Sequence, residues 1–323
     1  MVPVGWILVG ACWYIGLSTT DFVFWKIGIV FLGVMWYALR SQPRALLFIV
    51  VIGLSTFLSI EPKTSFLGIH GEWAWGFLSA CFFLLLTEVR TSGNWLKWLG
   101  VGLSVHCLLQ RYGIDPIVNL AILPGGYSTA YIGTHIDAGV LIAMSFPVLG
   151  RWLPLGLAGL WATHSRSGWM GALFALCPER LRVYLLPLFL VPFFLQAPKD
   201  IARVELWRIG ITSWQENPIL GSGPSTYQWG FERLKTDRLT RAVGHSYMQG
   251  HAHNDLVESL CTTGILGLLA YLWWVLPFLR NPSLLALFVA LKFNPVGFET
   301  LAAGALIAGN MNRELLIRRR QNT

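Results

Sequence analysis

Residues 245–279 read HSYMQGHAHNDLVESLCTTGILGLLAYLWWVLPFL. The first fourteen residues of this stretch contain three histidines, an asparagine and two carboxylates, and the remainder is an almost unbroken apolar run. A long apolar run is typical of a helix that crosses a membrane. Ionisable groups at membrane depth cost several kcal/mol unless they line water or pair with one another. The stretch therefore predicts a membrane helix with a functional site at its start.

The composition indicates an integral membrane protein. Of the 323 residues, 54% are hydrophobic and 12% are charged, with a mean hydropathy of +0.56, whereas a soluble protein has about 25% charged residues. The chain contains apolar runs near residues 4–17, 22–39, 45–60, 73–87, 93–110, 136–150, 152–163, 167–177, 181–196, 254–279, 281–291 and 296–311. Several are shorter than the roughly 20 residues that a span requires. We predict an all-α, polytopic transmembrane protein with about twelve spans.

The net charge is +8. The basic residues are distributed as the predicted membrane topology requires, so the charge does not indicate a nucleic-acid partner. With a cytoplasmic N-terminus and twelve spans, the inner loops contain many basic residues and few acidic ones, whereas the outer loops are nearly balanced. An excess of Arg and Lys in short loops marks the cytoplasmic side. This orientation places Arg166, His253 and the long polar segment 197–250 on the outer side.

The chain shows no internal repeat, so we predict a single membrane domain over residues 1–323. The segment 197–250 is a large outer loop within that domain and contributes part of the site. Its first part has apolar residues at spacings of three and four, which predicts an amphipathic helix over residues 200–216. Asn217-Pro218 ends this helix, and a Gly-rich turn follows at 221–224.

Four short motifs resemble those of the O-antigen ligase family, which also holds O-antigen polymerases and bacterial O-oligosaccharyltransferases. They are His251-Ala-His253-Asn254-Asp-Leu-Val-Glu258 with Gly264-Ile-Leu-Gly267 after it, Ser165-Arg166-Ser167-Gly168, Arg203-Val-Glu-Leu-Trp207, and Asn217-Pro218-Ile-Leu-Gly221-Ser-Gly223. They occur in the family's order and cover about residues 160–275. The resemblance implies a helical membrane fold of the GT-C-like type with a large periplasmic loop.

The resemblance also implies a reaction. Members transfer a glycan from an undecaprenyl-diphosphate-linked donor to an acceptor hydroxyl, at the periplasmic face of the bacterial inner (cytoplasmic) membrane. It implies an inverting, metal-independent glycosyltransferase without a cofactor. Its partners are the lipid-linked glycan, a lipid A core or other glycan acceptor, and membrane lipid. The particular function predicted is O-antigen ligase, in lipopolysaccharide biosynthesis of the cell envelope.

Three residues are the candidates for catalysis. A departing diphosphate needs fixed positive charge, and the planar fork of arginine suits bidentate contacts to phosphate, so Arg166 and Arg203 are expected to hold it. An imidazole titrates near neutrality, and His253 is therefore the candidate base for the acceptor hydroxyl. The plainer alternatives are an Arg166 that extends to the membrane interface, a solvated Arg203, and a His253 that bonds only to the start of its helix.

Further polar residues are predicted to bind substrate. Arg208 lies about 140° around a helix from Arg203 and is expected to face the diphosphate or lipid head groups. His251, Asn254 and Glu258 are expected to contact the substrate beside His253. A metal site remains a second interpretation, because His251, His253, Asp255 and Glu258 are all possible ligands, although their spacing differs from His-Glu-x-x-His.

Several functions remain open. With a second lipid-linked repeat unit as acceptor the protein is an O-antigen polymerase, and with a protein Ser it is a protein O-oligosaccharyltransferase. A transporter of the lipid-linked glycan is the alternative from another class, although transporters often show paired repeats. An intramembrane metal-dependent hydrolase is a third class, and it requires a third metal ligand beside His251 and His253.

Overall fold

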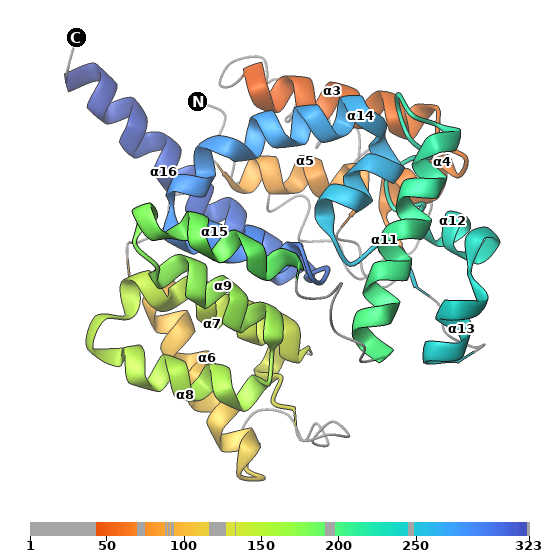
Figure 1. Cartoon of the computed structure of the whole chain (residues 1–323). Helices are drawn as coiled ribbons and strands as arrows, with labels where there is room; N and C mark the ends of the chain where they lie inside the picture. The colour runs from red at the N-terminus through yellow and green to blue at the C-terminus, as the bar shows by residue number, and fades with distance from the viewer. Residues whose placement is uncertain are drawn as a thin grey trace, which may run out of the picture.

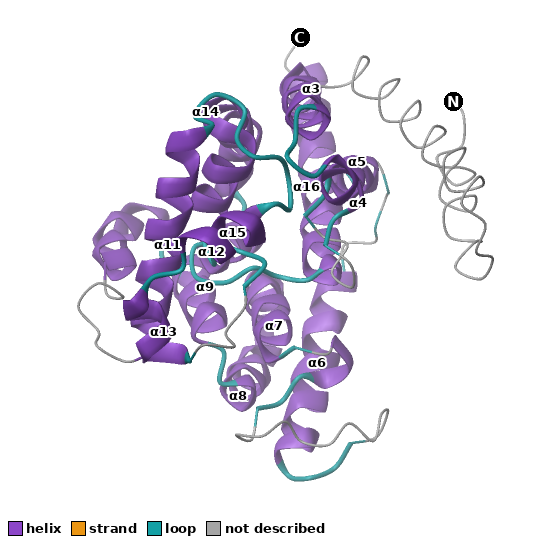
Figure 2. Cartoon of the chain, turned by 90° about the vertical axis from the view of Figure 1, so that its right-hand side faces the viewer, coloured by secondary structure: helices purple, strands orange, loops and turns teal. Residues whose placement is uncertain are grey.

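The structure is a computed structural model, which describes residues 43–69, 75–87, 89, 91, 94–115, 127–132, 134–190, 198–244 and 249–321. All regular elements in these ranges are helices (Figure 2), in agreement with the predicted all-α class. The α-helices are α3 (Pro43–Phe57), α4 (Pro62–Leu67), α5 (Phe77–Leu86), α6 (Trp95–Arg111), α7 (His135–Leu149), α8 (Leu153–Thr163), α9 (Arg166–Leu176), α11 (Pro198–Glu216), α12 (Tyr227–Leu234), α13 (Asp237–Val243), α14 (Asp255–Val275), α15 (Pro282–Leu291) and α16 (Phe298–Gln321). The short 3-10 helices are η1 (Ala130–Ile132), η2 (Gly150–Trp152), η3 (Glu179–Leu190) and η4 (Leu276–Arg280).

The helices form three neighbouring groups (Figure 1). Helices α6 to α9 lie side by side, and α15 packs on α7 and α9. Helices α3 and α5 and the second half of α14 form another layer. Helices α11, α12 and α13 form the third group, which packs on the first half of α14. The main apolar core lies between α6, α7, α9, α15 and α16, and a separate smaller core lies under α11 to α13. Helix α11 confirms the helix predicted over residues 200–216, but not its predicted apolar face: Ile211 is 43% exposed, and the helix contributes Ala202, Leu206 and Ile209 to the core instead.

Helices α7 and α8 form a tight hairpin. Gly150 takes φ 55° and ψ −122°, which ends α7, and the chain turns back through η2 into α8. A Cβ at Gly156 of α8 would lie 2.5 Å from Leu149 of α7, so the two arms are in direct contact. The arms have 15 and 11 residues, and each is shorter than the roughly 20 residues of a full span.

Helix α14 is broken at Gly264, which has φ 68° and ψ −172°. The backbone groups exposed by the break are bonded by the loop that follows α11. Ile265 N–H donates to the Pro218 carbonyl at 2.9 Å, and Gly223 N–H donates to the Thr262 carbonyl at 2.7 Å. A Cβ on Gly264 would lie 2.2 Å from the Ile219 carbonyl oxygen, so only glycine fits there. The 217–223 motif thus fixes the angle between the two halves of α14.

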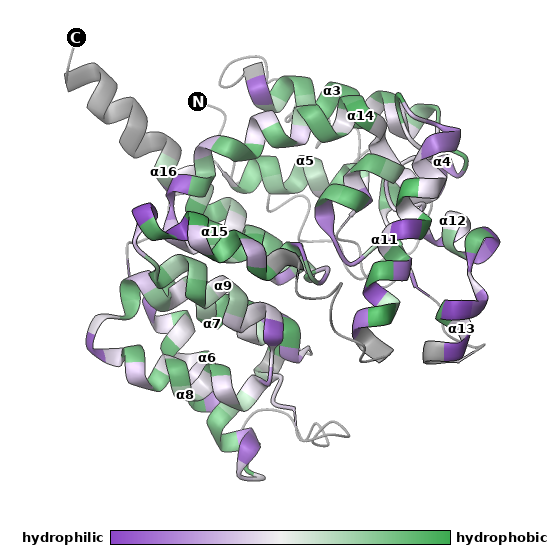
Figure 3. Ribbon diagram, in the orientation of Figure 1, coloured by the Kyte–Doolittle hydropathy of each residue, from purple (hydrophilic) through white to green (hydrophobic). Residues whose placement is uncertain are grey.

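The surface agrees with a membrane protein, although the number of spans stays a prediction. Two described segments, His135–Thr163 and Asp255–Arg280, are long and apolar enough to cross a membrane. The first of these turns back as the α7–α8 hairpin, so it does not form one continuous crossing helix, and the second contains the break in α14. Large apolar side chains are exposed along α3, α9 and α14, and Figure 3 shows the same helices as mostly hydrophobic. The predicted spans at 4–17 and 22–39 lie outside the described residues, and that at 181–196 begins as the 3-10 helix η3.

Candidate active site

The first candidate residue, Arg166, lies at the start of α9. Ser165 caps this helix, and its hydroxyl accepts a hydrogen bond from Gly168 N–H at 3.1 Å. Gly168 and Gly139 let α9 approach α7 closely, because a Cβ on Gly168 would lie 2.8 Å from the Gly139 carbonyl. The capped start of α9 therefore carries both the Arg166 side chain and the partial positive charge of a helix N-terminus.

Arg166 and Arg203 meet at one buried carboxylate. Asp200, in the first turn of α11, is 1% exposed. Its Oδ1 lies 3.3 Å from Nη1 of Arg166 and 3.2 Å from Nη1 of Arg203. The Arg166 side chain is 55% exposed and that of Arg203 is 15% exposed. Two guanidinium groups share one carboxylate, so the cluster keeps an excess of positive charge, with Arg166 at its open side.

Arg203 also connects this cluster to His253. Its Nε donates to the Phe293 carbonyl at 3.2 Å, and its Nη2 donates to Oδ1 of Asn294 at 3.4 Å. The same Oδ1 lies 3.3 Å from Nδ1 of His253. The structure therefore joins the three predicted catalytic residues in one network, which runs from Arg166 through Asp200, Arg203 and Asn294 to His253. Phe293 and Asn294 belong to the short connection between α15 and α16.

The turn that carries His253 is fixed by the other residues of its motif. His253 has φ 56°, a left-handed conformation that is uncommon outside glycine. Before it, Ala252 N–H donates to Oε2 of Glu258 at 2.6 Å, and His251 Nδ1 lies 3.4 Å from Oε1 of Glu258. After it, Asn254 caps α14 by accepting bonds from Leu256 and Val257 N–H. The predicted substrate contacts of His251, Asn254 and Glu258 stay predictions, and each of these residues supports the turn.

The surroundings of His253 change its basicity. Burial lowers the pKa of His253 from 6.5 to about 4; the nearby charges of Arg203 and His251 also lower it, while bonds to Asn294 and the Phe293 carbonyl oppose the shift. The expectation that this imidazole titrates near neutrality is therefore wrong for the protein without substrate. Buried away from water and next to a cation, the ring is neutral at pH 7 and retains a lone pair.

Arg208 belongs to a second cluster on α11. Its Nη1 lies 3.2 Å from Oε1 of Glu205, and Arg238 reaches the same oxygen at 3.3 Å. Oε2 of Glu205 accepts a bond from the hydroxyl of Thr236, the residue that caps α13. Arg208 is 61% exposed. The structure pairs Arg208 with Glu205 and Arg203 with Asp200, so the two arginines belong to different clusters.

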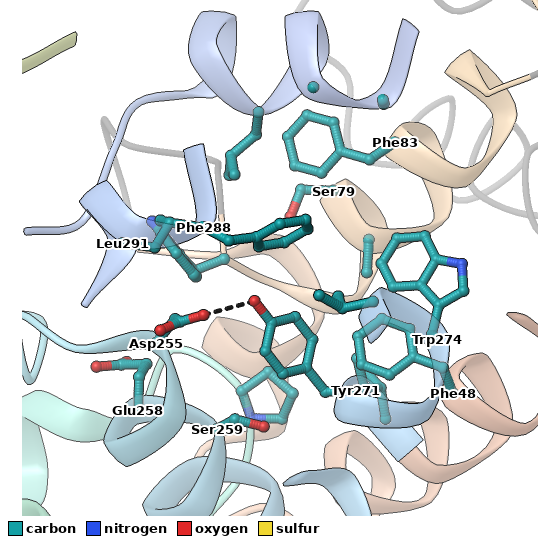
Figure 4. A pocket seen from close by; sticks show the side chains of 18 of the residues that line it. Phe48, Ser79, Phe83, Asp255, Glu258, Ser259, Tyr271, Trp274, Phe288 and Leu291 are labelled. Atoms are coloured by element: carbon teal, nitrogen blue, oxygen red, sulfur yellow. Dashed lines mark hydrogen bonds between the residues drawn. The ribbon is translucent and has the colours of Figure 1, made fainter. Parts of the chain in front are cut away.

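An apolar cavity adjoins the start of α14 (Figure 4). Its walls come from α3, α5, α14, α15 and α16, and most of its lining is apolar, with Phe48, Phe83, Trp274, Phe288 and Leu291 among its residues. Asp255 and Glu258 lie at its polar end. The Asp255 carboxylate accepts a bond from the Tyr271 hydroxyl at 2.5 Å and forms an ion pair with Lys292. The cavity can therefore bind an elongated apolar group, and the carboxylates at its polar end already have partners within the protein.

The site includes residues that the sequence analysis missed. Asp200 lies three residues before Arg203, a spacing that places two residues on the same helix face and could have indicated the pair. Asn294 lies in a short polar gap between two apolar runs, on the side predicted to be outer. The four residues considered as metal ligands do not share a centre: His251 faces Glu258, His253 faces Asn294, and Asp255 faces Lys292.

These features define a helical membrane protein with a cationic cluster and a neutral histidine beside an apolar cavity. Residues 178–272 match the model of the family described as O-antigen ligase. Through this segment, which is less than a third of the chain, the protein is similar to the O-antigen ligase family. The match supports an enzyme of the glycosyltransferase type, and the family is membrane-associated in bacteria. No curated protein matches the chain.

Proposed function

We propose that this protein is an O-antigen ligase, which transfers a glycan from an undecaprenyl-diphosphate-linked donor to a lipid A core sugar. The observation that carries the proposal is the network that links Arg166, Asp200, Arg203, Asn294 and His253. It puts positive charge for the leaving diphosphate and a base for the acceptor within one continuous set of contacts. The proposed membrane is the bacterial inner membrane, with the site at its periplasmic face.

In the proposed reaction, the donor diphosphate binds against Arg166 and the start of α9, with the charge of Arg203 behind it. Helix N-termini and arginines both favour phosphate groups. The polyprenyl chain lies along exposed apolar helices or in the adjoining apolar cavity. Preorganised positive groups of this kind contribute about 3–4 kcal/mol each when charge develops in the transition state.

The chemistry is a single displacement. The acceptor O–H gives its proton to Nε2 of His253 while the oxygen forms a bond to the anomeric carbon of the donor. The bond from that carbon to the diphosphate oxygen breaks, and the electron pair leaves with undecaprenyl diphosphate. Attack from the side opposite the leaving group inverts the anomeric configuration. This sequence of steps uses no metal and no cofactor.

Donor binding also affects the base. With a pKa of about 4, His253 is a weaker base than is best at neutral pH, because an efficient base has a pKa near the working pH. The negative diphosphate counters the charge of Arg203 and favours the protonated ring, so the pKa of His253 rises when the donor binds. The base therefore becomes stronger in the complex in which the acceptor is present.

The test is glycan transfer by the purified protein in the presence of chelator. The donor is an undecaprenyl-diphosphate-linked glycan, and the parallel acceptors are lipid A core, a second lipid-linked repeat unit and a Ser-containing peptide. The proposal expects product with lipid A core from wild type and none from His253→Ala. Product only with the repeat unit or the peptide would indicate the polymerase or the oligosaccharyltransferase. Movement of donor across a vesicle membrane, without any product, would indicate the transporter.

A further inference from the structure

Asn294 lies between the cationic cluster and the candidate base, and its side-chain oxygen has two neighbours. Nη2 of Arg203 donates to this oxygen at 3.4 Å, and Nδ1 of His253 lies 3.3 Å from it. Asn294 is 5% exposed. This buried amide contacts both the cation and the candidate base of the proposed mechanism, so it can influence both. The sequence motifs predict neither contact.

The orientation of the Asn294 amide follows from the chemistry of arginine. A guanidinium group has only donors, so the atom that faces Arg203 must be the oxygen of the amide. Turning the amide around would put its N–H groups against those of Arg203. Because the oxygen is fixed there and can only accept, the ring nitrogen next to it must carry a proton. In a neutral imidazole one nitrogen is a donor and the other an acceptor.

We infer that Asn294 is a positioning residue that sets the tautomer of His253, with the proton on Nδ1 and the lone pair on Nε2. The neighbour of Nε2 is Gln249, whose Oε1 lies 3.0 Å from it. The inference therefore requires the Gln249 amide to turn about its last torsion, so that its nitrogen faces the lone pair on Nε2.

The connection that carries Asn294 is held at three consecutive residues. Lys292 pairs with Asp255 at the start of α14, the Phe293 carbonyl accepts a bond from Arg203, and Asn294 contacts Arg203 and His253. The first of these ties the connection to the helix that follows His253, and the other two tie it to α11. This small network keeps the amide at a fixed distance from the imidazole, as the outer partners of catalytic histidines commonly do.

The inference deepens the proposed function, and it rests on that function for the task given to Nε2, which is to accept the proton of the acceptor hydroxyl. The tautomer itself can be measured without any glycan transfer. The purified full-length protein is labelled with [15N]histidine, and the two ring nitrogens of His253 are identified by the signals that disappear in His253→Gln. We expect a neutral ring at pH 7 with the proton on Nδ1. In Asn294→Leu, which has a similar size and no acceptor, we expect a clear population with the proton on Nε2. Asn310→Leu removes a distant amide that donates to Thr91 and is expected to leave the His253 signals unchanged.

A pH profile provides the second readout. The charged and titratable groups that face His253 are Arg203 of α11 and His251 of its own turn. Asn294→Asp keeps the acceptor oxygen and adds a negative charge beside the ring, which favours the protonated form. The acid limb of kcat/KM for the donor is expected to move upward by about 1–3 pH units, and Asn294→Leu is expected to lower kcat more than it raises KM.

The two readouts separate the possible failures. A proton on Nε2 in wild type would overturn the role of Asn294 and the task given to Nε2, while glycan transfer itself would still be measured by the assay. The same tautomer in wild type and Asn294→Leu would overturn the role of Asn294 alone. Absence of transfer by wild type, with the expected tautomers present, would overturn the proposed function and leave the positioning role in place. An unchanged acid limb in active, folded Asn294→Asp would also contradict the role of Asn294.

Discussion

Helix α11 carries two buried carboxylates that each hold a pair of arginines, and the two clusters differ in what else they contact. Asp200 and Glu205 are both 1% exposed. Around Glu205, both arginine side chains are more than half exposed, and the remaining partner is the residue that caps α13. Around Asp200, Arg203 is 15% exposed and continues through Asn294 to His253.

The difference shows that a buried ion pair on its own does not define a site. The Glu205 cluster joins α11 to the start of α13, and it fits the role of a tertiary contact between two helices. The Asp200 cluster joins the starts of α9 and α11 to the 292–294 connection and the turn before α14. What distinguishes it is the convergence of four separate chain segments with a neutral histidine and an apolar cavity beside them. The following predictions test whether this distinction is functional.

Removal of the candidate base should have the largest effect. His253→Gln keeps a polar side chain without an imidazole, and we expect glycan transfer to fall by about 10²–10⁴-fold, the usual contribution of a general base. His164 is a matched control, because it also has a left-handed backbone, with φ 53°, but it caps the end of α8 and contacts Tyr127 and Trp161 instead of the network. Initial rates of transfer measure both; a comparable loss in His164→Gln would show that the effect is not specific to the base.

Exchange of arginine for lysine should separate the two clusters. Arg203→Lys keeps the charge but loses the planar fork that reaches Asp200, Phe293 and Asn294 together. We expect transfer to fall by about 10²–10³-fold, as for the loss of one preorganised donor. Arg208→Lys alters the corresponding position on Glu205 and should have a much smaller effect. Equal losses in the two variants would remove the functional distinction between the clusters.

Neutralisation of the two carboxylates should affect stability alike and activity differently. Asp200→Asn and Glu205→Gln each leave two guanidinium groups without a buried counter-charge, so both should lower the midpoint of thermal unfolding. Asp200→Asn should also lower transfer by about 10–100-fold, because Arg166 and Arg203 lose the group that orients them. A Glu205→Gln protein that is as inactive as Asp200→Asn at a temperature where both are folded would count against the comparison.

The pH dependence of wild type gives the smallest of the expected effects. The pKa of His253 is about 4 without substrate, so the acid limb of kcat/KM for the donor should lie near that pH, since the base is active only when deprotonated. Bound diphosphate stabilises the protonated ring, so the acid limb of kcat should lie at a higher pH. Measured rates from pH 4 to 8 test the order of the two limbs; a kcat limb below the kcat/KM limb would contradict the direction of the shift.

The sequence predicted the parts of this account that depend on local pattern. The spacing of Val204, Trp207, Ile211 and Trp214 was enough to predict the helix that became α11, although the face that the helix buries is a different one, with Ala202, Leu206 and Ile209. The motifs identified Arg166, Arg203 and His253 as candidates. Hydropathy could not reveal the break in α14, because Gly264 lies inside an apolar run and its backbone conformation is set by the loop at 217–223.

The contacts of Asn294 could not be predicted either, because Asn294 lies 91 positions from Arg203 and 41 positions from His253 in the sequence. The low pKa of His253 could not be predicted from the sequence for the same reason. It depends on burial and on a cation brought close by the fold, and neither is visible in the local sequence. The pairing of Arg208 with Glu205 was accessible in principle, because the two residues are three positions apart on one helix.

The central claim is that Arg203 and His253 work as one site, and a double-mutant cycle tests it most directly. Transfer rates are measured for wild type, Arg203→Lys, His253→Gln and the double variant, under the same donor and acceptor concentrations. Residues that act as a unit are strongly non-additive, so the double variant should be little slower than the slower single variant. Multiplication of the two single losses in the double variant would show that the two residues act independently and would contradict the account.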